Sequence, residues 1–115
     1  MKNAKDIKPN YSAVYAAALY PDLCSIFHRH GYALAVHGSL ARDFDLIAIP
    51  WVETGVSSPG AVLAEITREF AIRLIGSYEV KPHGRLAQTI SVGHGECAID
   101  LSFMPAVPPV SPEVL

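Results

Sequence analysis

A glycine-serine pair separates two apolar segments and constrains the possible fold more than any other feature of this sequence. Residues 32–37 are apolar up to a terminal histidine, and residues 46–51 are apolar on the other side of the pair. Short apolar runs bounded by turn residues are typical of buried strands. We therefore predict a central strand over 32–37, a turn at Gly38-Ser39 and a second strand over 43–51.

Two aspartates open the second of these strands. Because side chains alternate between the faces of a strand, Asp43 and Asp45 point the same way, with Cα atoms about 7 Å apart. Asp100 lies in a later apolar segment, between Ile99 and Leu101, which point to the opposite face. If the two strands are neighbours, three carboxylates converge. Such carboxylates repel one another, and their hard oxygen atoms suit Mg²⁺ or Mn²⁺.

The remaining segments alternate between helical and strand-like patterns. Pro21 and Pro59 suit the first turn of a helix, and Gly31 suits a left-handed helix end. We predict helices over 11–19, 21–30 and 58–76, an edge strand over 78–81, and a hairpin with strands over 86–92 and 96–103. This order predicts one compact α+β domain with a mixed β-sheet and helices packed on one side.

Length and charge limit the range of partners. A chain of 115 residues suits one domain, and a formal net charge of -2 gives no global attraction to nucleic acid or anionic membranes. The first residues lack the apolar core of a signal peptide, and no apolar stretch reaches the length of a membrane span. Cys24 and Cys97 have no motif spacing, which indicates reduced thiols. We expect a cytoplasmic protein without a membrane partner.

The chain ends differ from the centre in composition. Residues 1–9 are polar and predict a flexible arm, whereas residues 105–115 carry four prolines and predict a tail without regular structure. The domain itself is predicted to span residues 10–104.

Several residues near the acids suit a phosphate group. Glycine allows the backbone to approach an anion closely, and a serine hydroxyl or an arginine can bind phosphate oxygens. Gly38, Ser39 and Arg42 lie just before the Asp-x-Asp pair, and Lys81 and Arg85 bracket a later turn. These five residues are the predicted phosphate contacts.

The Gly-Ser turn, the Asp-x-Asp pair and the later aspartate together resemble the signature of the DNA polymerase beta-like nucleotidyltransferase superfamily. Small bacterial or phage members also carry an Ala-Arg pair after the turn, as Ala41-Arg42 does here. The resemblance covers roughly residues 32–103. It implies a nucleotidyltransferase-like fold that binds a nucleoside triphosphate and Mg²⁺ or Mn²⁺ and transfers a nucleotidyl group to an unidentified acceptor. It implies that Asp43, Asp45 and Asp100 hold the metal, and that Gly38, Ser39, Arg42, Arg85 and Lys81 bind the nucleotide.

Other interpretations stay open. Only three residues separate Ser39 from Asp43, fewer than in active members, so the chain also fits a non-catalytic relative that binds a protein or a nucleotide. A small metal-dependent phosphohydrolase is a third class, although no histidine pair suggests water activation. If the resemblance is set aside, the sequence also fits a structural role in which Asp43 and Asp45 are solvated acids at a strand end or ion-pair partners of Arg42 and Arg85. The sequence predicts no oligomeric state.

Overall fold

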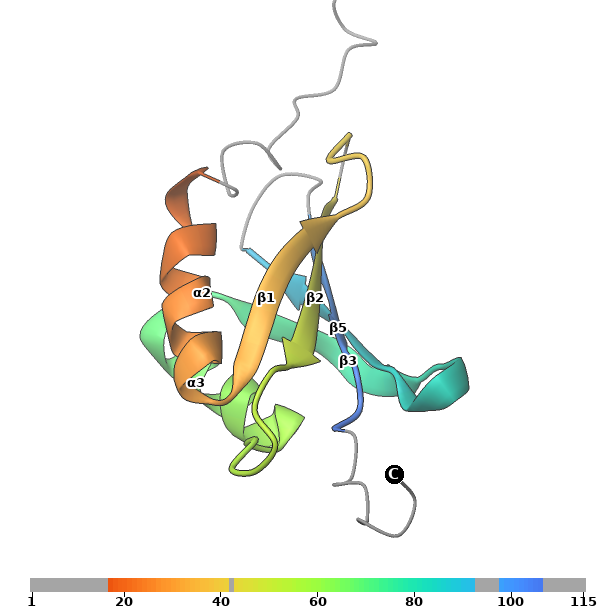
Figure 1. Cartoon of the computed structure of the whole chain (residues 1–115). Helices are drawn as coiled ribbons and strands as arrows, with labels where there is room; N and C mark the ends of the chain where they lie inside the picture. Colours follow the sequence, from red (N-terminus) through yellow and green to blue (C-terminus); the bar gives the residue numbers. More distant parts are fainter. Residues whose placement is uncertain (1–16, 42, 93–97, 107–115) are drawn as a thin grey trace, which may run out of the picture.

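The computed structural model describes residues 17–41, 43–92 and 98–106. In this part of the chain, a five-stranded sheet is covered on one face by helices α2 and α3 (Figure 1). The predicted class, a compact α+β domain with a mixed sheet and helices on one side, is confirmed. The elements in chain order are α2 (Tyr20–Arg29), β1 (Tyr32–His37), β2 (Phe44–Pro50), α3 (Pro59–Glu69), β3 (Arg73–Val80), the 3₁₀ turn η2 (Pro82–Gly84), β4 (Leu86–Ser91) and β5 (Ala98–Phe103).

The strand order places distant parts of the sequence side by side. The strands lie in the order β1-β2-β5-β4-β3, with β2 and β5 parallel and all other neighbours antiparallel. Strand β5 comes last in the sequence but lies between β2 and β4. The segment that follows Gly38-Ser39 therefore lies directly beside the segment that carries Asp100.

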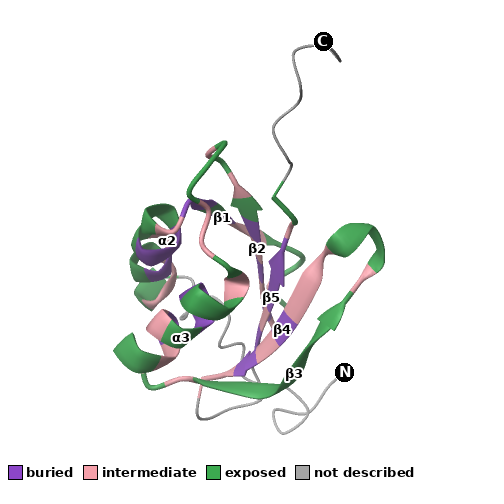
Figure 2. Ribbon diagram, turned by 90° about the horizontal axis from the view of Figure 1, so that it is seen from below, coloured by how far each residue is buried: buried purple, intermediate pink, exposed green. Residues whose placement is uncertain are grey.

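The core lies between the helices and one face of the sheet. Buried residues gather where α2 and α3 face β2 and β5 (Figure 2). The ring of Phe27 in α2 stacks on that of Phe103 in β5, with centroids 5.8 Å apart. Alternate residues of β2 and β5 supply the sheet side of the core: Phe44, Leu46, Ala48, Ile99, Leu101 and Phe103. Their neighbours on these strands point to the opposite face.

Both predicted helix starts are confirmed. Proline occupies the first turn of α2 and of α3, and the Ser58 hydroxyl oxygen accepts a hydrogen bond from the Ala61 N–H at 3.3 Å. This contact satisfies one of the backbone donors left unpaired in the first turn of a helix. After α2, Gly31 has a φ of +90°, the left-handed conformation that favours glycine.

Strand β1 covers residues 32–37 as predicted, but its predicted central position is wrong. It lies at one end of the strand order and pairs with β2 alone among the described strands. Its helix-facing residues are large, whereas Ala33 and Ala35 on the other face are small and at least partly exposed. The run is apolar throughout because the small residues of an edge strand tolerate contact with water, not because both faces are covered.

The predicted helix over 58–76 is also wrong in its second half. Helix α3 ends at Glu69, and the segment Arg73–Val80 forms β3 and passes through Gly76. Leu74 pairs with Ile90 of β4, so backbone pairing with the sheet overrides the helical spacing of the apolar residues. The predicted edge strand over 78–81 is the end of this longer edge strand.

Other boundaries shift by a few residues. The second predicted strand begins at Phe44, which leaves Asp43 just before it. The hairpin of β4 and β5 is confirmed, although residues 93–97 between its strands lie outside the described residues. The predicted arm over 1–9, residues 11–16 of the first predicted helix, Cys97 and the tail from 107 also lie outside them. No described helix has the length and apolar character needed to cross a membrane.

A buried glutamine supports an irregularity in the edge strand. The register between β3 and β4 shifts between Ile75 and Glu79, so the two backbones do not pair there. Gln88 is only 3% exposed, and its Nε2 donates to the backbone oxygens of Ile75 and Gly76 at 3.1 and 3.3 Å. The side chain therefore replaces backbone donors that the bulge removes.

Replacing Gln88 with methionine should reduce the free energy of unfolding by about 0.5–1.5 kcal/mol, because the carbonyl oxygens of Ile75 and Gly76 lose a hydrogen-bond donor while the side-chain volume changes little. Urea denaturation measures this loss. Ser25→Ala, which alters an exposed hydroxyl on α2, serves as the control and should change stability by less than about 0.5 kcal/mol. A Gln88→Met protein as stable as the wild type would show that the bulge does not depend on this amide.

Candidate metal and phosphate site

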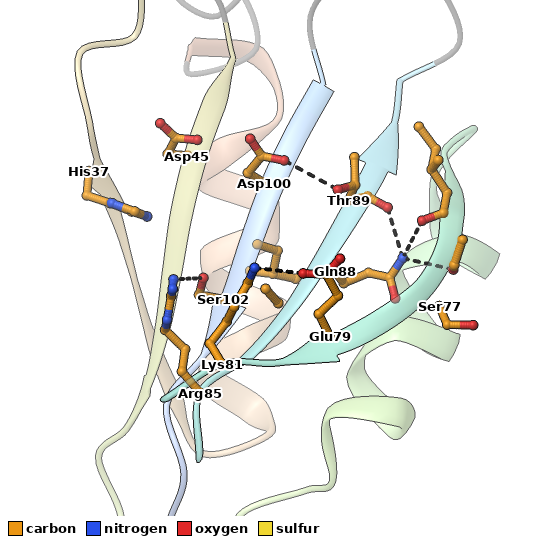
Figure 3. A pocket seen from close by; sticks show the side chains of 14 residues that line it. His37, Asp45, Ser77, Glu79, Lys81, Arg85, Gln88, Thr89, Asp100 and Ser102 are labelled. Carbon is orange, nitrogen blue, oxygen red and sulfur yellow. Dashed lines mark hydrogen bonds and ion pairs between the residues drawn. The ribbon is translucent and has the colours of Figure 1, made fainter. Parts of the chain in front are cut away.

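Four polar side chains form a row across the open face of the sheet. The strand register places His37 of β1 opposite Asp45 of β2, Asp45 opposite Asp100 of β5, and Asp100 opposite Thr89 of β4. All four line one groove on the face away from the helices (Figure 3). The sequence predicts only the two aspartates at this place and treats His37 as a strand-end residue. Thr89 was missed, although its alternation with buried Gln88 and Ile90 marks it as a residue of the open face.

The Asp45 and Asp100 carboxylates lie beside each other on neighbouring strands. Parallel strands are separated by about 4.8 Å, so paired residues on the same face are in close range. Burial raises the pKa of Asp100, and the charges of Asp43 and Asp45 together with a hydrogen bond to Asp45 raise it further. The Thr89 hydroxyl, 3.5 Å from Asp100 Oδ1, opposes this effect. The pair therefore resists carrying two negative charges.

Asp43 lies close to this pair but is engaged elsewhere. Its Oδ1 accepts a hydrogen bond from the Ala98 N–H at 3.3 Å, at the start of β5. Its charge still contributes to the raised pKa of Asp100. Within residues 17–41, 43–92 and 98–106, no three His, Cys, Asp or Glu side chains form a group that would hold a metal ion. The geometry thus gives a pair of acids with a third acid nearby.

The Gly38-Ser39 turn packs directly against the acids. Gly38 has a φ of +79°, and a Cβ built at this position would collide with Asp45 Oδ2. The backbone conformation therefore favours glycine here, and a larger residue would displace the Asp45 carboxylate. The Ser39 Oγ accepts a hydrogen bond from the Ala41 N–H at 3.2 Å, which holds the turn and leaves the hydroxyl proton available to donate. Arg42, the other predicted contact in this turn, lies outside the described residues.

The two predicted basic residues line the same groove as the acids. The groove has a volume of about 640 Å³, and Lys81 and Arg85 lie at the opposite end from Asp45 and Asp100 (Figure 3). Arg85 donates to the Ser102 hydroxyl at 2.9 Å, and Ser102 follows Asp100 by two residues on β5, about 7 Å along the strand. Ser102 is not among the residues that the sequence predicts for this site. Its place on the open face explains its role in orienting Arg85.

The basic residues do not neutralise the acid pair. Lys81 forms an ion pair with Glu79 at 2.6 Å, and Lys81 lowers the pKa of Glu79 through a hydrogen bond and its charge. Among the described residues, no carboxylate lies within 4.0 Å of the Arg85 guanidinium. The alternative in which Arg85 is an ion-pair partner of Asp43 or Asp45 is therefore wrong. Glu79 also lines the groove and balances the charge of Lys81, so Arg85 supplies the positive charge of the end opposite Asp45 and Asp100.

The residues present fit a divalent cation at the negative end. Asp45 and Asp100 supply hard oxygen ligands, and the raised pKa of Asp100 records a repulsion that a cation would relieve. Thr89 and His37 border this position and can bind the water molecules that Mg²⁺ usually retains.

Comparison with known proteins finds no family model, no curated protein and no solved structure that matches this chain. The groove carries paired carboxylates at one end and Arg85 at the other, and the Gly38-Ser39 turn packs against Asp45 beside the groove. These are the parts needed to bind a polyphosphate together with a cation.

Proposed function

We propose that this protein is a nucleotidyltransferase-like domain that binds a nucleoside triphosphate with Mg²⁺ or Mn²⁺ on the open face of its sheet. The supporting observation is the groove that carries Asp45 and Asp100 at one end and Arg85 at the other. An acid pair alone would bind a cation, and a basic end alone would bind an anion. A metal-bound triphosphate is the ligand class that suits both ends at once.

Each residue has a role in this proposal. Asp45 and Asp100 hold the cation, with the charge of Asp43 nearby, and Gly38-Ser39 lies against the bound phosphates. Arg85 and Lys81 bind the outer phosphate oxygens at the basic end. A bound divalent cation would polarise the phosphoryl oxygen and stabilise the charge that develops during nucleotidyl transfer. The acceptor remains unassigned.

A non-catalytic binding module is the second candidate. It is favoured by the engagement of Asp43 with the Ala98 N–H, which occupies one oxygen of the third acid. It is also favoured by the short connection from Ser39 to Asp43, which spans at most about 14 Å between Cα atoms. In this case the triphosphate would bind but would not be turned over.

Calorimetry with each nucleoside triphosphate in Mg²⁺ tests the proposal. We expect binding by the wild-type protein, about 10-fold weaker binding by Arg85→Gln because a charge-assisted hydrogen bond is lost, and no metal-dependent binding by Asp45→Asn. Arg68→Gln removes an exposed arginine on α3 and is the matched control. No binding of any triphosphate, or equal affinities for Arg85→Gln and Arg68→Gln, would contradict the proposal.

Pyrophosphate release separates the two candidates. From the short connection we expect weak or absent release by the wild-type protein. Fast release that disappears in Asp45→Asn would identify a working transferase, whereas binding without release would identify the binding module.

A further inference from the structure

A second cluster of reactive side chains lies on the helix side of the sheet, away from the groove. His30 follows α2, Ser57 lies in the connection between β2 and α3, and Glu65 belongs to α3. His30 Nδ1 is 2.7 Å from Ser57 Oγ, and His30 Nε2 is 2.9 Å from Glu65 Oε1. The imidazole therefore connects a hydroxyl to a carboxylate through its two nitrogen atoms.

The carboxylate determines how the protons are arranged. An ionised glutamate only accepts hydrogen bonds, so the neutral imidazole must carry its proton on Nε2 and donate it to Glu65. Nδ1 is then an acceptor, and the Ser57 hydroxyl must donate to it. The hydrogen bond of His30, and the hydrogen bond and charge of Arg29, lower the pKa of Glu65 and keep it ionised at neutral pH. A hydroxyl that donates to a carboxylate-oriented imidazole is the arrangement of an activated nucleophile.

Backbone and side-chain contacts hold the cluster in place. The Ser57 N–H donates to the His30 carbonyl oxygen at 2.9 Å, and the Tyr32 hydroxyl donates to the Ser57 carbonyl oxygen at 2.7 Å. Glu65 is also held by Arg29 at 2.6 Å. The side chains of His30 and Glu65 are each 18% exposed, so the base and its orienting group are mostly shielded from water. Such preorganisation is what a catalytic arrangement needs.

A small cavity adjoins the serine. It has a volume of about 270 Å³ and is lined by Ser57, Ser58 and Pro59 at the start of α3, and by apolar side chains that include Leu86 and Phe103. The polar start of α3 and the apolar wall suit an uncharged group with a carbonyl oxygen and a short hydrocarbon chain. The volume and the apolar wall of this cavity suit a short acyl ester.

We propose that Ser57, His30 and Glu65 form a second site that hydrolyses short-chain acyl esters. Ser57 Oγ attacks the ester carbonyl carbon, and its proton passes to His30 Nδ1. The bond between the carbonyl carbon and the alkoxy oxygen breaks, and the departing alcohol takes the proton from His30. Water then attacks the acyl-serine, passes its proton to His30, and releases the carboxylic acid as Ser57 recovers its proton. Glu65 is a positioning residue that stabilises the protonated imidazole.

Covalent labelling of the wild-type protein tests this site without a substitution. We expect an alkyl fluorophosphonate to add once to the folded protein, and mass spectrometry of the digested protein to locate the adduct on Ser57. Protein unfolded in urea should not react, because the label depends on the folded arrangement. A folded protein that carries no adduct, or carries it on another residue, would overturn the proposal.

Hydrolysis of p-nitrophenyl acetate gives the second measurement. Ser57→Ala should lower kcat/KM at least about 100-fold, whereas Ser25→Ala, on the exposed side of α2, should leave it unchanged. Glu65→Gln should lower kcat and alter its pH profile, because the imidazole loses its charged partner. Equal rates for the wild-type and Ser57→Ala proteins would overturn the proposal. That result would leave the cluster as a clamp between α2 and α3.

Discussion

Asp100→Asn should stabilise the metal-free protein at neutral pH and remove its stabilisation by Mg²⁺. Asp100 and Asp45 are like charges directly opposite each other on neighbouring strands, which typically costs about 0.2–1 kcal/mol. Asparagine keeps the size of the side chain and removes the charge. In the wild-type protein, Mg²⁺ at 100 times its dissociation constant should add about 2.7 kcal/mol to the free energy of unfolding, and in the variant it should add almost nothing.

The pH dependence of this difference has a defined sign. The folded state raises the pKa of Asp100 above its ordinary value of 3.8, so the folded protein binds more protons than the unfolded chain between the two values. Stability contributed by this group therefore falls as the pH rises through that window. The advantage of Asp100→Asn should be largest above the raised pKa and should disappear below about pH 3.8.

Thermal melts at neutral and acidic pH, with and without Mg²⁺, measure both effects. Asp22→Asn is the matched control, because Asp22 is an exposed carboxylate in the first turn of α2, where its charge is favourable. The control should lose a little stability and keep its response to Mg²⁺. An Asp100→Asn protein that is less stable than the wild type at neutral pH, or that keeps the Mg²⁺ response, would contradict the paired-carboxylate site.

Phe44→Ala should reduce the free energy of unfolding by about 3–5 kcal/mol, the largest loss that we expect from a single substitution. Phe44 is fully buried, and its ring meets that of Tyr20 edge to face with centroids 6.1 Å apart. It lies between Asp43 and Asp45 in the sequence and anchors the start of β2 to the core. Since small domains have total stabilities of about 5–15 kcal/mol, the variant should be close to unfolding.

Urea denaturation of Phe44→Ala, Phe44→Leu and Tyr78→Ala separates the stability contributed by burial in the core from that contributed by an aromatic side chain as such. Phe44→Leu should lose much less stability than Phe44→Ala, because most of the buried volume is retained. Tyr78→Ala removes an aromatic residue that is 56% exposed on β3 and should cost little. Similar losses for Phe44→Ala and Tyr78→Ala would show that the start of β2 is not part of the core.

Local chemistry accounts for the parts of the fold that the sequence predicts well. Strand β1 and the start of α3 are bounded by Gly31, Gly38 and Ser58-Pro59, residues whose backbone preferences act within a few positions. The end of α3 and the position of β1 depend instead on pairing across the sheet. Leu74 fits the helical spacing of the apolar residues in α3, and its pairing with Ile90 of β4 accounts for the end of the helix before it.

In the candidate site, too, some features follow from local sequence and others depend on pairing across the sheet. Alternation along one strand predicts that Asp45 points away from the core, and it does the same for Asp100. Their mutual contact requires β5 to insert beside β2, which no local pattern specifies. The position of Arg85 beside Ser102 depends likewise on the β4–β5 pairing, and the contribution of Thr89 appears only when that register is known.

The parallel pairing of β2 with β5 also determines at which stage of folding the groove forms. Asp43 and Ala98, which bond across this contact, are 55 residues apart in the chain, whereas β1 meets β2 and β3 meets β4 across short connections. Closing a long loop costs more conformational entropy than closing a short one, and contacts between distant residues slow folding. Among the described strands, the pair β1-β2 and the group β5-β4-β3 are joined along β2 and β5. A chain in which they have not yet joined has no groove and no opposed charges, so the repulsion between the acids is met only once the final sheet is assembled.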